Sequence, residues 1–241
     1  MTSSTSRELE IFRCEGVSKH FAHTQVLSDI GFSVYAGEIL GIIGPNGAGK
    51  TTLMECLTGL LPCDTHALFW RQQPILPRLT KEFLYYLPDG IQPYPDQIVE
   101  TVLRFFQRLY AADIAQYNVL ISRLELRPIL RKVIHSLSKG YRRRLLLAIG
   151  LLSRQPLLML DEPFDGFDLR QTLGVMNLLR ETLADRTLLL SIHQLSEAEK
   201  ICDRFLLLSE GRVAAIGSLK QLREQTGLHG GGLEEVFLAI V

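Results

Sequence analysis

Residues 44–52 read Gly44-Pro45-Asn46-Gly47-Ala48-Gly49-Lys50-Thr51-Thr52. They fit the pattern G-x-x-x-x-G-K-[ST], whose glycines let backbone N–H groups approach phosphate oxygens without a side chain in the way. Lys50 is expected to reach the β- and γ-phosphates, and the Thr51 hydroxyl is expected to bind Mg²⁺. The motif therefore predicts a binding site for ATP and Mg²⁺, with all nine residues next to the phosphates.

The sequence around this loop has the order that the motif requires. The apolar run Ile39–Ile43 precedes the glycines, as a buried strand of a parallel sheet would. Residues 51–60 read as a helix, whose N-terminus adds a partial positive charge beside the phosphates. An ordinary glycine-rich turn between a strand and a helix is the alternative, but it does not account for Lys50 and Thr51 in the same place.

A second motif places two acids after another apolar run. Leu157-Leu158-Met159-Leu160 is followed directly by Asp161 and Glu162. A buried strand would deliver Asp161 to the phosphates, where it can hold Mg²⁺ through water. Glu162 is expected to polarise the attacking water as a general base. Two acids after a strand are often only a solvated loop, so this interpretation depends on the phosphate loop being present.

Composition limits the class of protein. The chain has 241 residues, of which 46% are hydrophobic, so a disordered chain is excluded. Lys and Arg together number 26, as do Asp and Glu, so no general attraction to nucleic acid is expected. The cysteines lie at 14, 56, 63 and 202 without a C-x-x-C pair, which favours free thiols. No segment reads as a signal peptide or a membrane span, so any membrane part is expected from another chain.

Strand-like and helical patterns alternate along the chain. Residues 11–34 and 205–216 predict strands and a closing hairpin, and no internal repeat is present. Four side chains are expected on the buried face of the first helix of a helical insert: Val102, Phe105, Phe106 and Leu109. The remaining expectations are a frayed tail at 1–8, helices over 114–126 and 138–152, strands over 156–160 and 187–192, a helix capped by Ser196 with Glu199, and a hinge at 230–232 before a terminal helix.

Residues 137–142 read Leu137-Ser138-Lys139-Gly140-Tyr141-Arg142 and lie about twenty residues before the acid pair. This segment resembles the signature, usually written LSGGQ, of the ATPase subunit of ABC transporters, and the resemblance extends from about residue 11 to the end. It implies that Ser138 and Gly140 grip the γ-phosphate of ATP held by a second subunit. Lys139 and Tyr141 depart from the usual glycine and glutamine.

The signature also gives a physical hint of its own. Ser138 is a good N-cap, yet four cations crowd the first turns of the helix behind it: Lys139, Arg142, Arg143 and Arg144. A helix N-terminus disfavours cations, and an anion bound there would relieve the conflict. The alternative is that these side chains point into solvent or pair with acids elsewhere in the chain.

Further positions are matched one at a time by the resemblance. Phe21 resembles the aromatic residue that stacks on adenine, although it could also be a core phenylalanine. His193 resembles the switch histidine that contacts the γ-phosphate, and Asp168 the acid of the loop that joins two active sites. Asp89 stands where the family usually has a glutamine that touches Mg²⁺ and water. The ending 233–238 resembles multidrug and polymer exporters more than haem exporters.

The fold expected from this resemblance is α/β, with a P-loop core of ABC type, an antiparallel β edge and an inserted α-helical subdomain. The core is placed at 11–96 and 154–217, the helical subdomain with its signature at 97–153, and a C-terminal helical tail at 218–241. The expected function is ATP hydrolysis that drives an exporter at the cytoplasmic face of the inner or plasma membrane, through a separate permease.

The expected partners are that membrane-spanning permease and a second ATPase subunit, identical or different, with no nucleic acid. The main alternative is a soluble ABC-type ATPase that acts on nucleic acid, the ribosome or metal-cluster assembly; the zero net charge and the single nucleotide-binding unit weigh against it. A regulatory subunit that binds ATP without hydrolysing it is a third possibility, and Glu162 and His193 argue against it.

Overall fold

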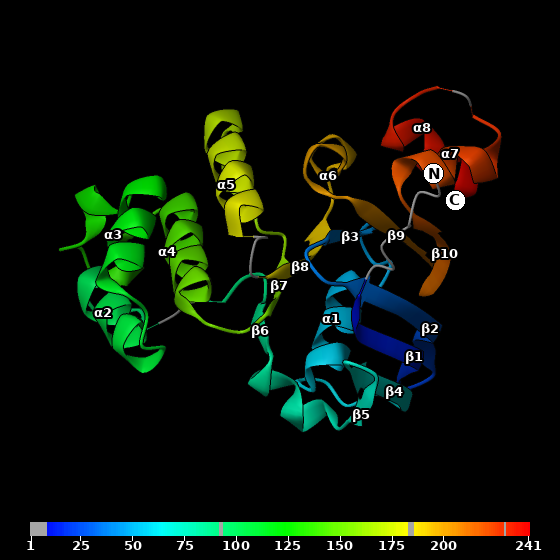
Figure 1. The fold of residues 1–241 in the computed structure, drawn as a ribbon, viewed down its shortest axis with the longest axis horizontal. Coiled ribbons are helices and arrows are strands. Elements are labelled where there is room, and N and C mark those ends of the chain that lie inside the picture. Colours follow the sequence, from blue (N-terminus) through cyan, green and yellow to red (C-terminus); the bar gives the residue numbers. More distant parts are fainter. Residues whose placement is uncertain (1–8, 92–93, 183–185, 229) are drawn as a thin grey trace, which may run out of the picture.

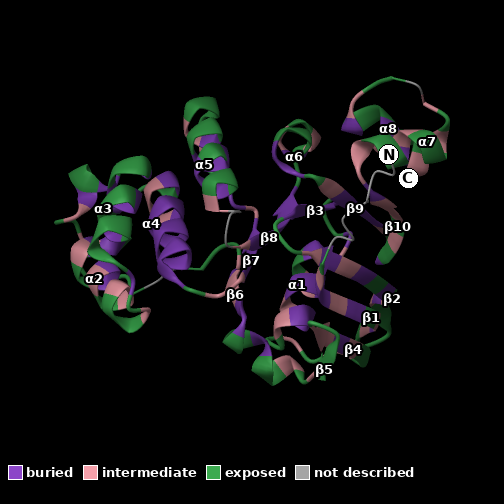
Figure 2. Cartoon of the chain, viewed as in Figure 1, coloured by how far each residue is buried: buried purple, intermediate pink, exposed green. Residues whose placement is uncertain are grey.

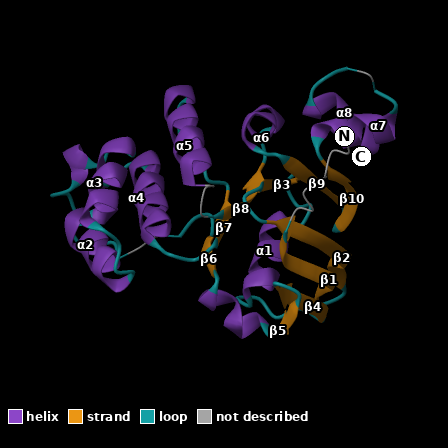
Figure 3. Cartoon of the chain, in the orientation of Figure 1, coloured by secondary structure: helices purple, strands orange, loops and turns teal. Residues whose placement is uncertain are grey.

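The computed structural model describes residues 9–91, 94–182, 186–228 and 230–241, so the tail expected at 1–8 lies outside the described residues. The strands are β1 (Glu10–Phe21), β2 (Thr24–Tyr35), β3 (Ile39–Ile43), β4 (Thr65–Trp70), β5 (Gln73–Ile75), β6 (Leu84–Leu87), β7 (Leu157–Asp161), β8 (Thr187–Ile192), β9 (Arg204–Ser209) and β10 (Arg212–Gly217). The α-helices are α1 (Lys50–Thr58), α2 (Val99–Leu109), α3 (Ile114–Arg123), α4 (Lys139–Leu152), α5 (Leu169–Glu181), α6 (Leu195–Ile201), α7 (Leu219–Thr226) and α8 (Leu233–Ile240). The strands run from the middle of the molecule to its right side, with α2–α5 at the left and α7 and α8 at the upper right (Figures 1 and 3).

Among the described residues the strands form a six-stranded and a four-stranded sheet. The first has the order β10-β9-β3-β8-β7-β6 and is parallel except for the β9–β10 hairpin, and the second, β2-β1-β4-β5, is antiparallel. The expected α/β class with an antiparallel part is confirmed. Because β3, β8 and β7 are parallel neighbours, the loops that follow them open at the same edge of the sheet.

Both faces of the six-stranded sheet are covered, which explains its unbroken apolar strands. On β3, Leu40 and Ile42 pack in one core with α1 and the four-stranded sheet, while Ile39 and Ile43 pack in another with α4 and α6. β7 alternates in the same way, and Figure 2 shows β3, β7 and β8 as buried. Helix α1 is thereby held between the two sheets, directly behind the phosphate loop.

Helices α2, α3 and α4 lie together at one side of the molecule (Figure 1). Their core is continuous with the six-stranded sheet through α4, whose apolar side chains belong to the same cluster as Leu158 and Leu188. The predicted helix 138–152 is confirmed, since α4 begins after the N-cap Ser138 and ends at Leu152. No helix among the described residues has both the length and the apolar character needed to span a bilayer.

The expected buried face of α2 is wrong for two of its four residues. Its buried stripe is Val99, Val102 and Leu103, so Phe105 and Leu109 point outward and are 55% and 60% exposed. Val102 is buried as expected, but Val99 and Leu103 complete the buried stripe in place of Phe105 and Leu109. At 100° per residue the buried face is rotated by roughly 60° from the expected one, and a hydrophobic strip is left on the surface.

Two predicted helix ends are also corrected. Ser196 does not cap α6, because the helix starts at Leu195 and its N-cap is Gln194. Helix α3 ends at Arg123 rather than near 126, since Glu125 takes a left-handed φ of 51°. The N–H of Leu126 then bonds back to the carbonyl of Ile121 at 2.9 Å, which satisfies the helix end.

Two helical glycines give a matched test of the packing between α4 and β6. A Cβ at Gly150 would lie 2.8 Å from the Tyr85 ring, whereas a Cβ at Gly174 in α5 would meet nothing within 4 Å. We expect Gly174→Ala to raise the free energy of unfolding by up to about 1 kcal/mol through helix propensity. Gly150→Ala should lower it by about 1–3 kcal/mol through overpacking. Denaturant unfolding of both variants checks this, and equal effects would contradict the packing.

Candidate nucleotide site

The phosphate loop joins β3 to α1 in a conformation that needs its glycines. Gly47 and Gly49 have φ of 83° and 100°, and Gly49 is the N-cap of α1. A Cβ on Gly44 would lie 2.3 Å from the Leu208 carbonyl oxygen, and one on Gly49 2.7 Å from Leu27. The loop is therefore pressed against β2 and β9, with the first-turn N–H groups of α1 free to bind an anion.

Lys50 is buried and lies over its own loop. Its Nζ donates to the carbonyl oxygens of Gly44 at 2.8 Å and Pro45 at 3.2 Å. An ammonium has three donors, and neutral carbonyls are weaker partners for it than anionic oxygens. The Lys50 ammonium is thus already positioned at the loop and can exchange these carbonyls for phosphate oxygens.

Asp161 connects the phosphate loop to the end of β8. Its carboxylate is fully buried and accepts from the Thr51 hydroxyl at 2.8 Å and from the Ser191 hydroxyl. Thr51 and Asp161 thus place two hard oxygen ligands side by side, the donor chemistry that Mg²⁺ prefers. Among the described residues no group of three or more His, Cys, Asp and Glu could hold a metal by itself, so phosphate oxygens and water would supply the other ligands.

Glu162 follows β7 with a left-handed φ of 48°. Its N–H lies 3.2 Å from the carbonyl oxygen and 3.1 Å from the hydroxyl of Ser191, and its Oε2 lies 2.6 Å from His193 Nδ1. Its carbonyl oxygen accepts from Arg143. The carboxylate predicted as general base is therefore in contact with the predicted switch histidine, one residue from the Thr51–Asp161 pair.

The start of α4 is organised within this chain. The Ser138 hydroxyl accepts from the Tyr141 N–H at 3.4 Å. A Cβ on Gly140 would lie 2.9 Å from the Gly166 carbonyl oxygen, so packing alone requires a glycine there. The expected cation conflict is resolved for three of the four side chains by acids of the same chain, in the pairs Lys139–Asp165, Arg143–Asp89 and Arg144–Glu125.

Phe21, Ser138 and Asp168 have their contacts outside the Thr51–Asp161–Glu162–His193 group. Phe21 is half-exposed at the end of β1, with Lys19 Nζ 5.3 Å from its ring centre. Asp168 is the N-cap of α5 and forms a capping box with Gln171. Within the part of the chain that the structure describes, Phe21, Ser138 and Asp168 make no hydrogen bond or ion pair with that group.

Sequence reasoning missed two residues of this site. Ser191 was counted only as one residue of the predicted strand 187–192. A hydroxyl in a buried strand needs a hydrogen-bond partner, and this signal could have pointed to Ser191. Arg143 was counted only among the cations of the signature helix. Its buried guanidinium instead reaches the ends of β6 and β7, a direction that a sequence pattern does not give.

The sequence of this chain matches a known protein family and several of its members. A protein-family model described as ABC transporter matches residues 27–165. An uncharacterized ABC transporter ATP-binding protein from Methanocaldococcus jannaschii is 30% identical over 215 residues, which cover 87% of this chain and 78% of that protein. Nod factor export ATP-binding protein I from Burkholderia lata is 34% identical over 215 residues, with 86% and 71% covered.

Solved structures agree. A structure titled as the ATP binding subunit of an ABC transporter aligns with a TM-score of 0.86 at 30% identity, covering 95% of this chain and 99% of that one. The ADP conformation of an ATP-binding cassette aligns with a TM-score of 0.77 at 21% identity over 95% of this chain and 98% of that one, and supports the fold alone.

Lys50 gives the first test of the site. We expect Lys50→Ala to weaken ATP binding and to lower hydrolysis about 100-fold or more, because a charge aimed at the phosphates is lost. Lys220→Ala, which removes an exposed lysine on α7, is the control and should keep both properties. The measurements are equilibrium binding of a fluorescent ATP analogue and the steady-state ATPase rate. Normal hydrolysis by Lys50→Ala would exclude its proposed contact.

Glu162 gives the second test. We expect Glu162→Gln to bind ATP normally and to hydrolyse it about 100- to 10,000-fold more slowly, since an amide cannot accept the proton of water. Glu234→Gln on the exposed side of α8 is the control. Single-turnover hydrolysis and ATP retention after gel filtration measure the two properties. Turnover near the wild-type rate would remove Glu162 from the role of general base.

Proposed function

We propose that this chain, which belongs to the ABC transporter family, powers an exporter at the cytoplasmic face of a membrane. As an ATP-binding subunit of that family it binds ATP and hydrolyses it. The observation that carries the proposal is the contact network from Thr51 through Asp161 to Glu162 and His193, at the edge where the phosphate loop opens. The export direction is supported by the exporter-like ending 233–238 and by the relatives named for Nod factor export.

The proposed chemistry divides between two neighbouring parts of the site. Lys50 and the first N–H groups of α1 bind and orient the β- and γ-phosphates. Thr51 and Asp161 would hold Mg²⁺, which when bound neutralises phosphate charge. Glu162 takes the proton of the attacking water, and His193, 2.6 Å from its carboxylate, orients it. The chain's own residues thus supply binding, orientation and a base.

ABC ATP-binding proteins dimerise, and we propose that two copies of this chain close head-to-tail around two ATP molecules. Ser138 and Gly140 of one copy would then face the phosphate loop of the other. Phe21 would stack on adenine, since its ring is half-exposed at the end of β1. Asp168 would lie between the two sites. The contacts of Ser138 support this arrangement, because its hydroxyl accepts from the Tyr141 N–H of its own helix whereas Lys50 donates to the phosphate loop.

ABC ATP-binding proteins also work with membrane subunits, and the hydrophobic strip on α2 is our proposed contact with the permease. Phe105, Leu109 and Ile98 are exposed and line one open pocket, whose rim carries Arg104, Arg108 and Arg131. Tyr94 is exposed as well and extends the strip, with its ring centre 6.3 Å from that of Phe106. Pro93, the residue before Tyr94, lies outside the described residues. The helical subdomain 97–153 would thus receive a short helix of the permease.

The permease contact predicts a selective loss of binding. We expect Tyr94→Ala combined with Phe105→Ala to reduce co-purification with the permease at least about tenfold, because exposed aromatic anchors dominate interfaces. ATP binding should stay unchanged, since neither residue touches the phosphate loop. Leu238→Ala, which removes an exposed apolar side chain on α8, is the control. Equal loss of permease and ATP binding would show that the two aromatic residues only pack on their own domain.

The shared site predicts rescue between two inactive variants. Lys50→Ala destroys its own phosphate loop and keeps its signature, whereas Ser138→Arg does the reverse. A mixed dimer contains one site with both halves intact, so mixing should restore ATPase activity that neither variant has alone. Because strict coupling of the two sites would hide rescue, dimerisation of Glu162→Gln with ATP should be followed by sedimentation as well. No rescue together with a monomeric Glu162→Gln would contradict the head-to-tail dimer.

A further inference from the structure

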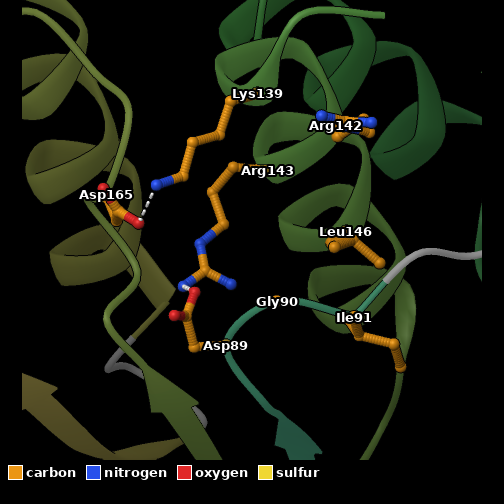
Figure 4. A pocket seen from close by; sticks show the side chains of 8 residues that line it. All are labelled: Asp89, Gly90, Ile91, Lys139, Arg142, Arg143, Leu146 and Asp165. Atoms are coloured by element: carbon orange, nitrogen blue, oxygen red, sulfur yellow. Dashed lines mark hydrogen bonds and ion pairs between the residues drawn. The ribbon is translucent and has the colours of Figure 1, made fainter. Parts of the chain in front are cut away.

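Arg143 lies where helix α4 meets the ends of strands β6 and β7. It lies on α4, is 5% exposed, and reaches across to the ends of β6 and β7. Its Nη2 lies 3.1 Å from Asp89 Oδ1, and its Nη1 donates to the Pro88 carbonyl oxygen at 3.4 Å. Nε donates to the Glu162 carbonyl oxygen at 3.1 Å, and Nη2 contacts the carbonyl oxygens of Asp161 and Glu162. Figure 4 shows the guanidinium pointing down from α4 onto Asp89.

The contact with Glu162 fixes an unfavourable backbone. A φ of 48° is a left-handed conformation that costs about 1 kcal/mol or more for a residue with a side chain. The Glu162 peptide groups are held on both sides, with the N–H on Ser191 and the carbonyl on Arg143. Because this conformation directs the Glu162 carboxylate to His193, the Arg143 fork holds the general base in its orientation.

The contact with Asp89 offsets a charge. Asp89 stands in the loop after β6, where the family resemblance leads one to expect a neutral glutamine. A bare carboxylate there would repel the ATP phosphates. Burial lowers the pKa of Arg143, and the carboxylates of Asp89, Asp161, Asp165 and Glu162 oppose that shift, so the guanidinium remains a cation. It is the only cation paired with Asp89 among the described residues.

We propose that Arg143 is a positioning residue for ATP hydrolysis with two separable roles. Its planar fork sets the backbone of Glu162, and its charge is what allows an aspartate at position 89. This inference rests on the proposed ATPase function and adds a residue to it. Lysine would keep the charge but not the fork, and glutamine would keep neither, so the two roles can be tested separately.

The experiment is a double-mutant cycle in the intact transporter. Arg143→Gln should lower kcat about 100-fold and change KM for ATP less than about threefold, because Glu162 loses its clamp and Asp89 loses its cation while the phosphate loop is untouched. Adding Asp89→Asn should recover about tenfold of that loss by removing the unpaired carboxylate. Arg143→Lys should also lower kcat, but adding Asp89→Asn to it should recover nothing.

A second readout does not depend on activity. The melting temperature of the nucleotide-free chain should fall in Arg143→Gln and recover partly in the double variant with Asp89→Asn, because the ion pair is present without ATP. Arg144→Gln is the matched control: it removes another buried arginine of α4, one paired with Glu125 at 2.8 Å. It should lower stability without any coupling to Asp89.

Each outcome decides a separate claim. If the effects of Arg143→Gln and Asp89→Asn on kcat multiply, and their effects on the melting temperature add, the two residues are not coupled. That result would overturn the role of the charge. Wild-type kcat in Arg143→Lys would overturn the role of the fork. A wild-type transporter without ATPase activity would contradict the proposed function instead, and the melting cycle would still test the ion pair.

Discussion

The parallel pairing of β3, β8 and β7 is the constraint on which the rest of the structure depends. In this pairing Ile43 lies opposite Ile192, and Asp161 opposite Ser191, so both turns leave the sheet at the same level. Without it the phosphate loop after β3 and the acids after β7 would be distant in space as well as in sequence. The two buried faces of these strands keep the register, because a slip of one residue would exchange the two cores.

The site is connected to the helical part of the molecule by polar side chains as well as by the apolar packing of α4 on the sheet. Lys139 contacts Asp165 at 2.5 Å, and Arg143 binds the carbonyl oxygens beyond β7, so the start of α4 is tied to the acid loop. The same helix packs against α2, which carries the exposed strip. The acid loop beyond β7 and the exposed strip on α2 are therefore joined through α4 by direct contacts.

The sequence alone predicted the parts that depend on local chemistry. The phosphate loop, the acid pair and the Ser138 cap are each defined by a few adjacent residues, and the α/β class was implied by the family resemblance of these motifs. The direction of Arg143 and the partner of Ser191 depend on elements far apart in the chain, and no local pattern encodes them. The exposed side of α2 was misjudged because Leu103, Phe105 and Phe106 are all apolar, so periodicity fits two faces.

The central claim is that this chain binds its nucleotide chiefly through the β- and γ-phosphates, at the loop after β3. Isothermal titration of the wild-type chain with ATP and with AMP, each with Mg²⁺, tests it most directly. The account predicts a Kd for ATP about 100-fold or more below that for AMP, a difference of roughly 2.7 kcal/mol. Equal affinities would contradict it, because binding would then rest on the adenosine and not on Lys50 and its loop.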